Sequence, residues 1–168
     1  RVMSAFYPLD SVETIDDFVA ASRTVAGGGS LGVEDLCHVD GETPHVARTT
    51  DETYRFRCFF DGVALSYLVD EAVEIHTESP GGSAIELTVT PDGTVDSSPA
   101  DAVMSLGIAT DAADVADPTA AQVYEAVCTY VKAFPSRAAY LSWAAAVDGA
   151  TVGLPLADGV PIATALAE

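Results

Sequence analysis

Two thiols and one carboxylate are the groups in this chain that could do chemistry together. The run Cys58-Phe59-Phe60-Asp61 places a carboxylate three residues after a thiol, and a second usable thiol, Cys128, lies far downstream. Thiolates are the ligands that soft metal ions prefer, and a carboxyl group beside them can supply or accept a proton. These residues predict a site that binds a soft metal and moves a proton next to it.

A structural role for the same residues stays open at this point. Free cysteines are commonly buried and behave as small hydrophobic residues. In that case Cys58 fills a core position, Asp61 caps the following helix, and Cys128 lies on the apolar end of another helix. If Cys58 is reactive instead, a helix N-terminus and the neighbouring Arg57 are expected to stabilise its thiolate. The spatial placement of Cys128 relative to Cys58 decides between the two roles.

The third cysteine and the histidines form weaker patterns. Cys37 and His38 are adjacent, and adjacent side chains rarely point toward one metal ion. We expect His45 and His76 at surface positions, on a loop and on a strand, and neither has a second histidine at zinc-binding spacing. These residues therefore predict no zinc site.

The charge of the chain restricts its partners. Seven Lys and Arg residues against 26 Asp and Glu residues give a net charge of −19, and Lys132 is the only lysine. Such a field repels phosphate backbones and anionic lipids, so we expect neither a nucleic acid nor a membrane as partner. The spread of acidic residues and the scarcity of lysine resemble proteins of salt-accumulating halophiles, in which high salt screens the self-repulsion.

Length and composition predict a globular protein of the cytoplasm. The 168 residues fit one domain with a sufficient core, and 49% of them are hydrophobic. Three cysteines without a C-x-x-C motif fit free thiols in a reducing compartment. No transmembrane run or signal peptide is recognised, although the chain opens at Arg1 rather than at methionine.

The elements that must position the site are predicted from periodicity. A first helix follows Asp10 and stops at the glycines of 27–29, and 30–52 is expected to be loop with at most a short strand. Alternating apolar residues predict strands over 54–58, 73–78, 85–90 and 103–108, of which the last three form one group. Shorter strands are expected at 130–134 and 152–156.

Further helices are expected between these strands. A buried helix opens at Asp61, and others follow an Asp117-Pro118 start, a Ser136 cap with an end at Gly149, and a start near Asp158. The pattern is α+β, a mostly antiparallel sheet with helices packed against it. We divide the chain into a short helix-plus-loop extension, residues 1–53, and an α+β domain, residues 54–168.

From Tyr54 to the C-terminus the chain resembles the alkylmercury (organomercurial) lyases. Cys58-x-x-Asp61 before an apolar helix is similar to the family's catalytic cysteine and aspartate, and Cys128 falls at the position of its second catalytic cysteine. Other similar segments are AIELTVTP at 84–91, AVMSL at 102–106, DAADV at 111–115, and Trp143.

The resemblance implies an alkylmercury lyase-like enzyme that cleaves carbon–mercury bonds by protonolysis. Cys58 then attacks the metal first, Cys128 completes a dithiolate, and Asp61 takes and returns the protons. The products are a hydrocarbon and thiolate-bound Hg(II), which passes to a dithiol acceptor or a mercuric reductase. The resemblance implies no cofactor, because the mercury belongs to a small organometallic substrate.

Two other functions stay open on the same residues. One is a non-catalytic protein that binds Hg or Cu through the thiolates of Cys58 and Cys128. The other is a thiol redox or sensor module in which these cysteines form a reversible disulfide.

The chain departs from the family pattern in places that bear on substrate range. Residues 1–53 are shorter than the family's N-terminal region, and Arg57 replaces an aromatic residue. Cys128-Thr129 replaces a pair of cysteines, and Tyr130-Val131-Lys132 replaces a histidine-rich segment.

Overall fold

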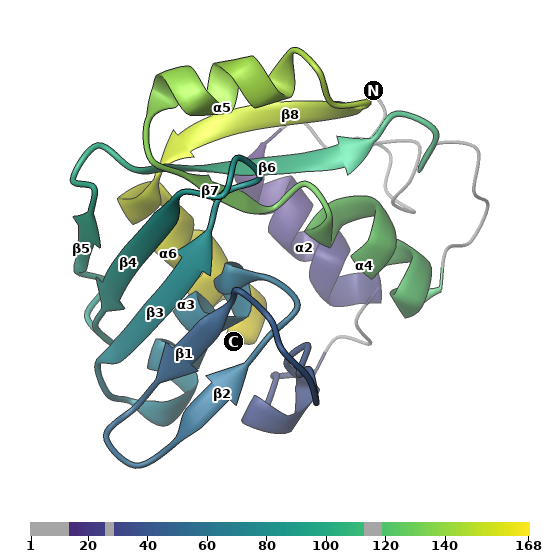
Figure 1. The fold of residues 1–168 in the computed structure, drawn as a ribbon. Helices are drawn as coiled ribbons and strands as arrows, with labels where there is room; N and C mark the ends of the chain where they lie inside the picture. Colours follow the sequence, from purple (N-terminus) through teal and green to yellow (C-terminus); the bar gives the residue numbers. More distant parts are fainter. Residues whose placement is uncertain (1–13, 26–28, 113–118) are drawn as a thin grey trace.

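The structure of the chain is a computed structural model that describes residues 14–25, 29–112 and 119–168 (Figure 1). It contains two antiparallel sheets, one of five strands and one of three, with helices packed against them. The predicted α+β class is therefore confirmed. The predicted start of the first helix, at Asp10, lies outside the described residues.

The five-stranded sheet has the strand order β2-β1-β3-β4-β5. Its strands are β1 (Val46–Arg48), β2 (Thr53–Arg55), β3 (Val73–Glu78), β4 (Ala84–Val89) and β5 (Val95–Ser98). The alternation that predicted β3 and β4 is confirmed, because every second residue of each strand is buried. This buried face carries the main core.

The three-stranded sheet has the order β7-β6-β8, formed by β6 (Val103–Ala109), β7 (Lys132–Phe134) and β8 (Gly149–Pro155). The prediction that 103–108 joins the strands of 73–90 in one group is wrong. β6 pairs with β7 and β8 instead, and the strand beside β4 is β5, which was not predicted. β5 is a half-exposed edge strand of mostly polar residues, so it lacks the apolar alternation that marks a strand in sequence.

Helices hold the two sheets together. α3 (Phe59–Val69) packs against β3, β1 and α6 (Leu156–Ala167), while α4 (Ala120–Cys128) packs on β6 and α5 (Arg137–Ala144) packs on β8 (Figure 1). α2 (Ile15–Val25) contacts α6. Gly62 permits the close approach of α3, since a Cβ there would lie 3.1 Å from Ile75. A larger residue at that position would push the start of α3 away from the sheet.

Several predicted helix boundaries need correction. α3 begins at Phe59, so Cys58 is its N-cap residue and Asp61 lies in its first turn. The N-cap of α4 is Thr119, whose hydroxyl accepts a hydrogen bond from the Gln122 N–H, and the predicted start at 117–118 lies outside the described residues. The Ser136 cap of α5 is confirmed, but α5 ends at Ala144, and Gly149 opens β8 instead.

The segment that the sequence assigns to an extension contributes to the five-stranded sheet. A short 3-10 helix, η1 (Val33–Asp35), precedes β1, and β1 pairs with both β2 and β3. The domain division at residue 53 stays a prediction, but the loop of 30–52 does contain the one short strand allowed for it.

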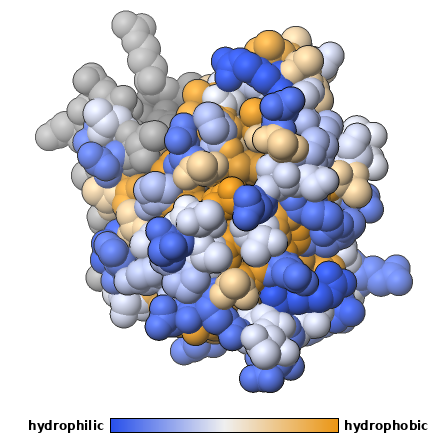
Figure 2. All heavy atoms as spheres, turned by 90° about the vertical axis from the view of Figure 1, so that its left-hand side faces the viewer, coloured by the Kyte–Doolittle hydropathy of each residue, from blue (hydrophilic) through white to orange (hydrophobic). Residues whose placement is uncertain are grey.

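The surface agrees with the dispersed charge of the sequence. On the face shown in Figure 2, hydrophilic side chains are scattered widely, with apolar side chains visible between them. None of the described helices combines the length and the apolar character needed to cross a membrane.

Candidate functional site: two thiols and a carboxyl group

Cys58 lies where the strand pairing of its segment ends and α3 begins. Its side chain is 5% exposed and belongs to the core. The preceding residues pair with the 37–39 loop, since the Arg57 N–H donates to the Cys37 carbonyl at 2.9 Å and His38 forms a β-bridge with Phe56. This pairing fixes the backbone on both sides of the thiol and brings Cys37 to the same end of α3.

Asp61 lies one helical turn after Cys58, and the turn brings the two side chains together. The Cys58 Sγ donates a hydrogen bond to the Asp61 Oδ2 at 3.7 Å. Burial raises the pKa of the Asp61 carboxyl to about 6. Three smaller influences lower this pKa: the hydrogen bond from Cys58, the backbone N–H of Cys37 and the charge of His38. A carboxyl group with a pKa near neutrality can both accept and donate a proton.

Cys128 is the last residue of α4 and comes from a distant part of the chain. Its thiol lies close enough to the Cys58 thiol for a hydrogen bond between the two to shift the pKa of both. The structure therefore brings the three predicted residues, Cys58, Asp61 and Cys128, into one cluster. All the cysteines are free thiols.

The pKa values of the two thiols in the cluster are shifted in opposite directions. The hydrogen bond shared with Cys128, burial and the carboxylate of Asp61 raise the pKa of Cys58 well above its ordinary value. The same hydrogen bond lowers the pKa of Cys128. The charges of Lys132 and Arg57 act in the same direction, while burial and the charge of Asp61 oppose them. Within the pair, the lower pKa therefore belongs to Cys128 and the higher one to Cys58.

This result corrects the expectation that a helix N-terminus and Arg57 stabilise the Cys58 thiolate. Cys58 does sit at the N-cap of α3, but only the backbone N–H of Asp61 lowers its pKa, and that effect is the smallest acting on it. Arg57 is exposed, and its charge acts on Cys128 and Cys37.

Cys37 is a neighbour of the cluster that the sequence did not place there. Burial raises the pKa of its thiol to about 12, and the charges of Asp61 and Cys128 add to the rise. It is therefore a protonated thiol at neutral pH. No periodic pattern marks the 37–39 segment, because its pairing with 55–57 involves a few isolated hydrogen bonds.

The histidines lie apart from a metal site. Among the residues that the structure describes, no group of three or more His, Cys, Asp and Glu side chains could hold a metal ion. His38 is exposed, with its Nε2 2.7 Å from the Val33 carbonyl, and His76 forms an ion pair with Glu86.

His45 was predicted at the surface, and that prediction is wrong. Its side chain is 9% exposed, and its Nδ1 lies 2.7 Å from the Thr77 Oγ1. Burial lowers its pKa to about 4, with smaller contributions from the charges of Lys132 and His76, so the ring is neutral at pH 7. In the sequence His45 is an isolated histidine, and nothing around it indicates that its side chain is buried.

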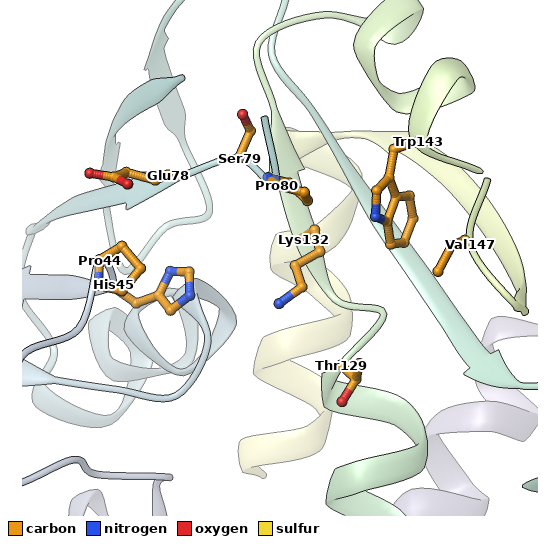
Figure 3. Close-up of a pocket in the computed structure, with 9 residues that line it drawn as sticks. All are labelled: Pro44, His45, Glu78, Ser79, Pro80, Thr129, Lys132, Trp143 and Val147. Atoms are coloured by element: carbon orange, nitrogen blue, oxygen red, sulfur yellow. The ribbon is translucent and has the colours of Figure 1, made fainter. Parts of the chain in front are cut away.

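His45 borders a pocket of about 350 Å³ that also reaches the end of α4 (Figure 3). We call it the Lys132 pocket. Its apolar walls are Pro44, Pro80, Trp143 and Val147, and its polar groups come from His45, Glu78, Ser79, Thr129 and Lys132.

Comparisons with known proteins bear on the family and the fold of the chain. The family model for alkylmercury lyase matches residues 39–168. A solved structure described as the mercury-bound form of MerB2 superimposes with a TM-score of 0.60 at 15% sequence identity, covering 93% of this chain and 76% of that one. No curated protein matches the chain. At that identity the structural likeness supports the fold, and the family match covers most of the chain. The chain therefore belongs to the alkylmercury lyase family.

Proposed function

We propose that this protein cleaves carbon–mercury bonds by protonolysis, with Cys58, Asp61 and Cys128 as its catalytic residues. The observation that carries the proposal is the meeting of two thiols from distant segments with a carboxyl group that one of them contacts at 3.7 Å. Family membership gives the reaction class. Nothing in the reaction calls for a cofactor, because the metal arrives with the substrate.

Cys128 is the first ligand in our proposal. Its lowered pKa makes it the available thiolate, and thiolates rather than thiols bind soft metals. Its attack on an R–Hg⁺ cation displaces the ligand that the mercury carried in solution. This order is the reverse of the one that the family resemblance suggested, in which Cys58 attacks first.

Cys58 and Asp61 then complete the reaction. The Cys58 thiol gives its proton to the Asp61 carboxylate, and the resulting thiolate binds the mercury. Two thiolates raise the electron density on the metal and weaken the Hg–C bond. Asp61 returns the proton to the carbon, which takes the electron pair of the broken bond. One proton and one R–Hg⁺ thus give one hydrocarbon and one neutral Cys58–Hg–Cys128 bridge.

The test is the release of benzene from phenylmercury, measured by gas chromatography with the purified protein. We expect turnover in the wild type, and loss of turnover in Cys58→Ser. Cys37→Ser is the matched control, since it removes a neighbouring thiol that our mechanism does not use. Equal benzene release by the wild type and Cys58→Ser would refute the proposal.

A thiol redox function is the second candidate, because a hydrogen-bonded pair of free thiols is also placed to form a disulfide. Titration of the free thiols before and after a mild oxidant separates the two functions. Loss of two thiols per chain, without benzene release from phenylmercury, would favour the redox function. A non-catalytic metal binder would hold Hg(II) through both thiols and release no benzene.

A further inference from the structure

The Lys132 pocket contains the only lysine of a chain with a net charge of −19. Lys132 is half-buried at the start of β7, and its backbone N–H donates to the Ser105 Oγ at 3.2 Å. Figure 3 shows its ammonium directed toward the ring of His45, while the Glu78 carboxylate points away from it. Among the described residues, no carboxylate forms a salt bridge with Lys132.

These features suit a small anion with a short apolar body. The neutral His45 ring and the Trp143 indole lie on opposite sides of the Lys132 side chain (Figure 3). The negative charge of the protein as a whole repels anions. Lys132, a cation without a carboxylate partner in the described part of the chain, is the group that can attract an anion to this pocket. A volume of about 350 Å³ limits the ligand to a small molecule.

The pocket lies on the Cys128 side of the proposed site. Thr129, one of its lining residues, directly follows Cys128. The Lys132 ammonium is also close enough to Cys128 to lower the pKa of its thiol. Cys58, Asp61 and Cys128 itself do not line the pocket, which reaches the end of α4 at Thr129. A molecule bound in it and extending past Thr129 would reach the end of α4, where Cys128 lies.

We propose that the Lys132 pocket binds a low-molecular-weight thiol that carries a carboxylate, and that this thiol removes Hg(II) from Cys128. The inference rests on the proposed function, because it concerns the product of that reaction. The pocket's separation from Asp61 favours an incoming thiol over the leaving hydrocarbon, which must be protonated at Asp61.

The transfer is a ligand exchange without oxidation or reduction. The carboxylate pairs with Lys132, and the thiolate of the acceptor forms a sulfur–mercury bond as the Cys128–mercury bond breaks. Cys128 leaves as a thiolate. A second acceptor thiol then replaces Cys58 at the metal, and its proton passes to the Cys58 sulfur, which restores the starting thiol.

The experiment loads the purified protein with one equivalent of HgCl₂ and measures the rate of Hg(II) extraction. Thioglycolate is the carboxylate thiol, and 2-mercaptoethanol is the neutral thiol of similar size; rates are compared per thiolate. We expect thioglycolate to extract about tenfold faster, the size of one charge-assisted hydrogen bond. Lys132→Met should bring the ratio of the two rates close to one, and Lys132→Arg should keep most of it.

Arg57→Met is the matched control, because it removes another cation that acts on Cys128 but does not line the pocket. Its rate ratio should stay near that of the wild type. A wild-type ratio near one, or an equal fall of the ratio in Arg57→Met and Lys132→Met, would overturn the proposal.

A second measurement separates failure of this proposal from failure of the proposed function. Trp143 is the only tryptophan and lines the pocket, so its fluorescence reports binding without mercury. The probe is (methylthio)acetate, a carboxylate whose sulfur cannot bind as a thiolate. We expect a saturable change that Lys132→Met abolishes. If the protein neither cleaves phenylmercury nor retains Hg(II), this change still supports the anion pocket. If the fluorescence does not change, anion binding in the Lys132 pocket is refuted, even if the protein cleaves phenylmercury.

Discussion

The two cysteines of the candidate site have environments that are the opposite of what their positions on helices suggest. Cys58 caps the N-terminus of α3, where a helix dipole favours a thiolate, and Cys128 ends α4, where the dipole disfavours one. Yet the pKa of Cys58 is raised and that of Cys128 is lowered. The surroundings of each thiol therefore outweigh its helix.

The difference between the two environments has a direct cause. Cys58 is buried beside the carboxylate of Asp61, to which its thiol donates, and its hydrogen-bond contact with Cys128 raises its pKa further. Cys128 accepts that hydrogen bond and lies within reach of the charges of Lys132 and Arg57. Cys58 therefore keeps its proton more strongly than Cys128 does, which is the basis of the order of attack that we propose.

The largest expected effect comes from removing either thiol. Cys58→Ser and Cys128→Ser should each reduce cleavage of phenylmercury by about 10³-fold or more, because groups that act as a unit fail together. The two variants should differ in the first step. Cys58→Ser should still capture methylmercury at neutral pH through Cys128, whereas Cys128→Ser should capture it slowly. Stopped-flow measurement of methylmercury capture by the two variants checks this. Equal capture rates would contradict the difference that we infer between Cys58 and Cys128.

Asp61→Asn should separate catalysis from binding and stability. We expect a fall in benzene release of about 10²–10³-fold from loss of the proton relay, with Hg(II) binding retained. The Asp61 pKa rises from 3.8 to about 6 on folding, so its stabilising contribution is complete below pH 3.8 and is lost as the pH rises through 6. At pH 7 the variant should therefore be more stable, by up to roughly 3 kcal/mol.

Urea unfolding at pH 4 and at pH 7 measures this gain. It should be present at pH 7 and small at pH 4. A variant that is equally stable at both values would show that the Asp61 carboxyl is not buried as described.

Alkylation should distinguish the cysteines by a smaller factor. Iodoacetamide at pH 7 reacts with thiolates, so we expect Cys128 to be modified several times faster than Cys58 or Cys37. The pKa of Cys37 is about 12, which leaves almost no thiolate at this pH. Peptide mapping by mass spectrometry follows the three sites in one reaction. Faster modification of Cys58 than of Cys128 would reverse our order of attack.

The smallest effect concerns the charge of Lys132. This ammonium lowers the pKa of His45 as well as that of Cys128, although burial is the larger influence on His45. Lys132→Met should therefore raise the pKa of His45 from about 4 by a fraction of a unit. An NMR titration of the His45 ring protons measures the shift, with His76 as an internal reference. A fall in the His45 pKa would show that the ammonium does not face this ring.

Much of the fold could be predicted because local patterns matched the final surroundings of each residue. The alternation in β3 and β4 survives as alternate burial, and Ser136 caps α5 as expected. The second sheet was not predicted, since β6 is buried along nearly its whole length and gives no information on its partners. Strand pairing over long distances in sequence is set by packing, which local patterns do not record.

By itself, the sequence placed Cys58 and Asp61 near each other, because only two residues separate them; the structure adds that both belong to the first turn of α3, where residues three apart share a face. It also determined the acidic surface and, through the family resemblance, the importance of Cys128. Only the tertiary structure decided that α4 would deliver Cys128 to Cys58, that Cys37 would join them, and that Lys132 would face a pocket beside them. The tertiary structure also decided the direction of each pKa shift, because the burial and the charges around a site come from segments that meet only in the folded chain.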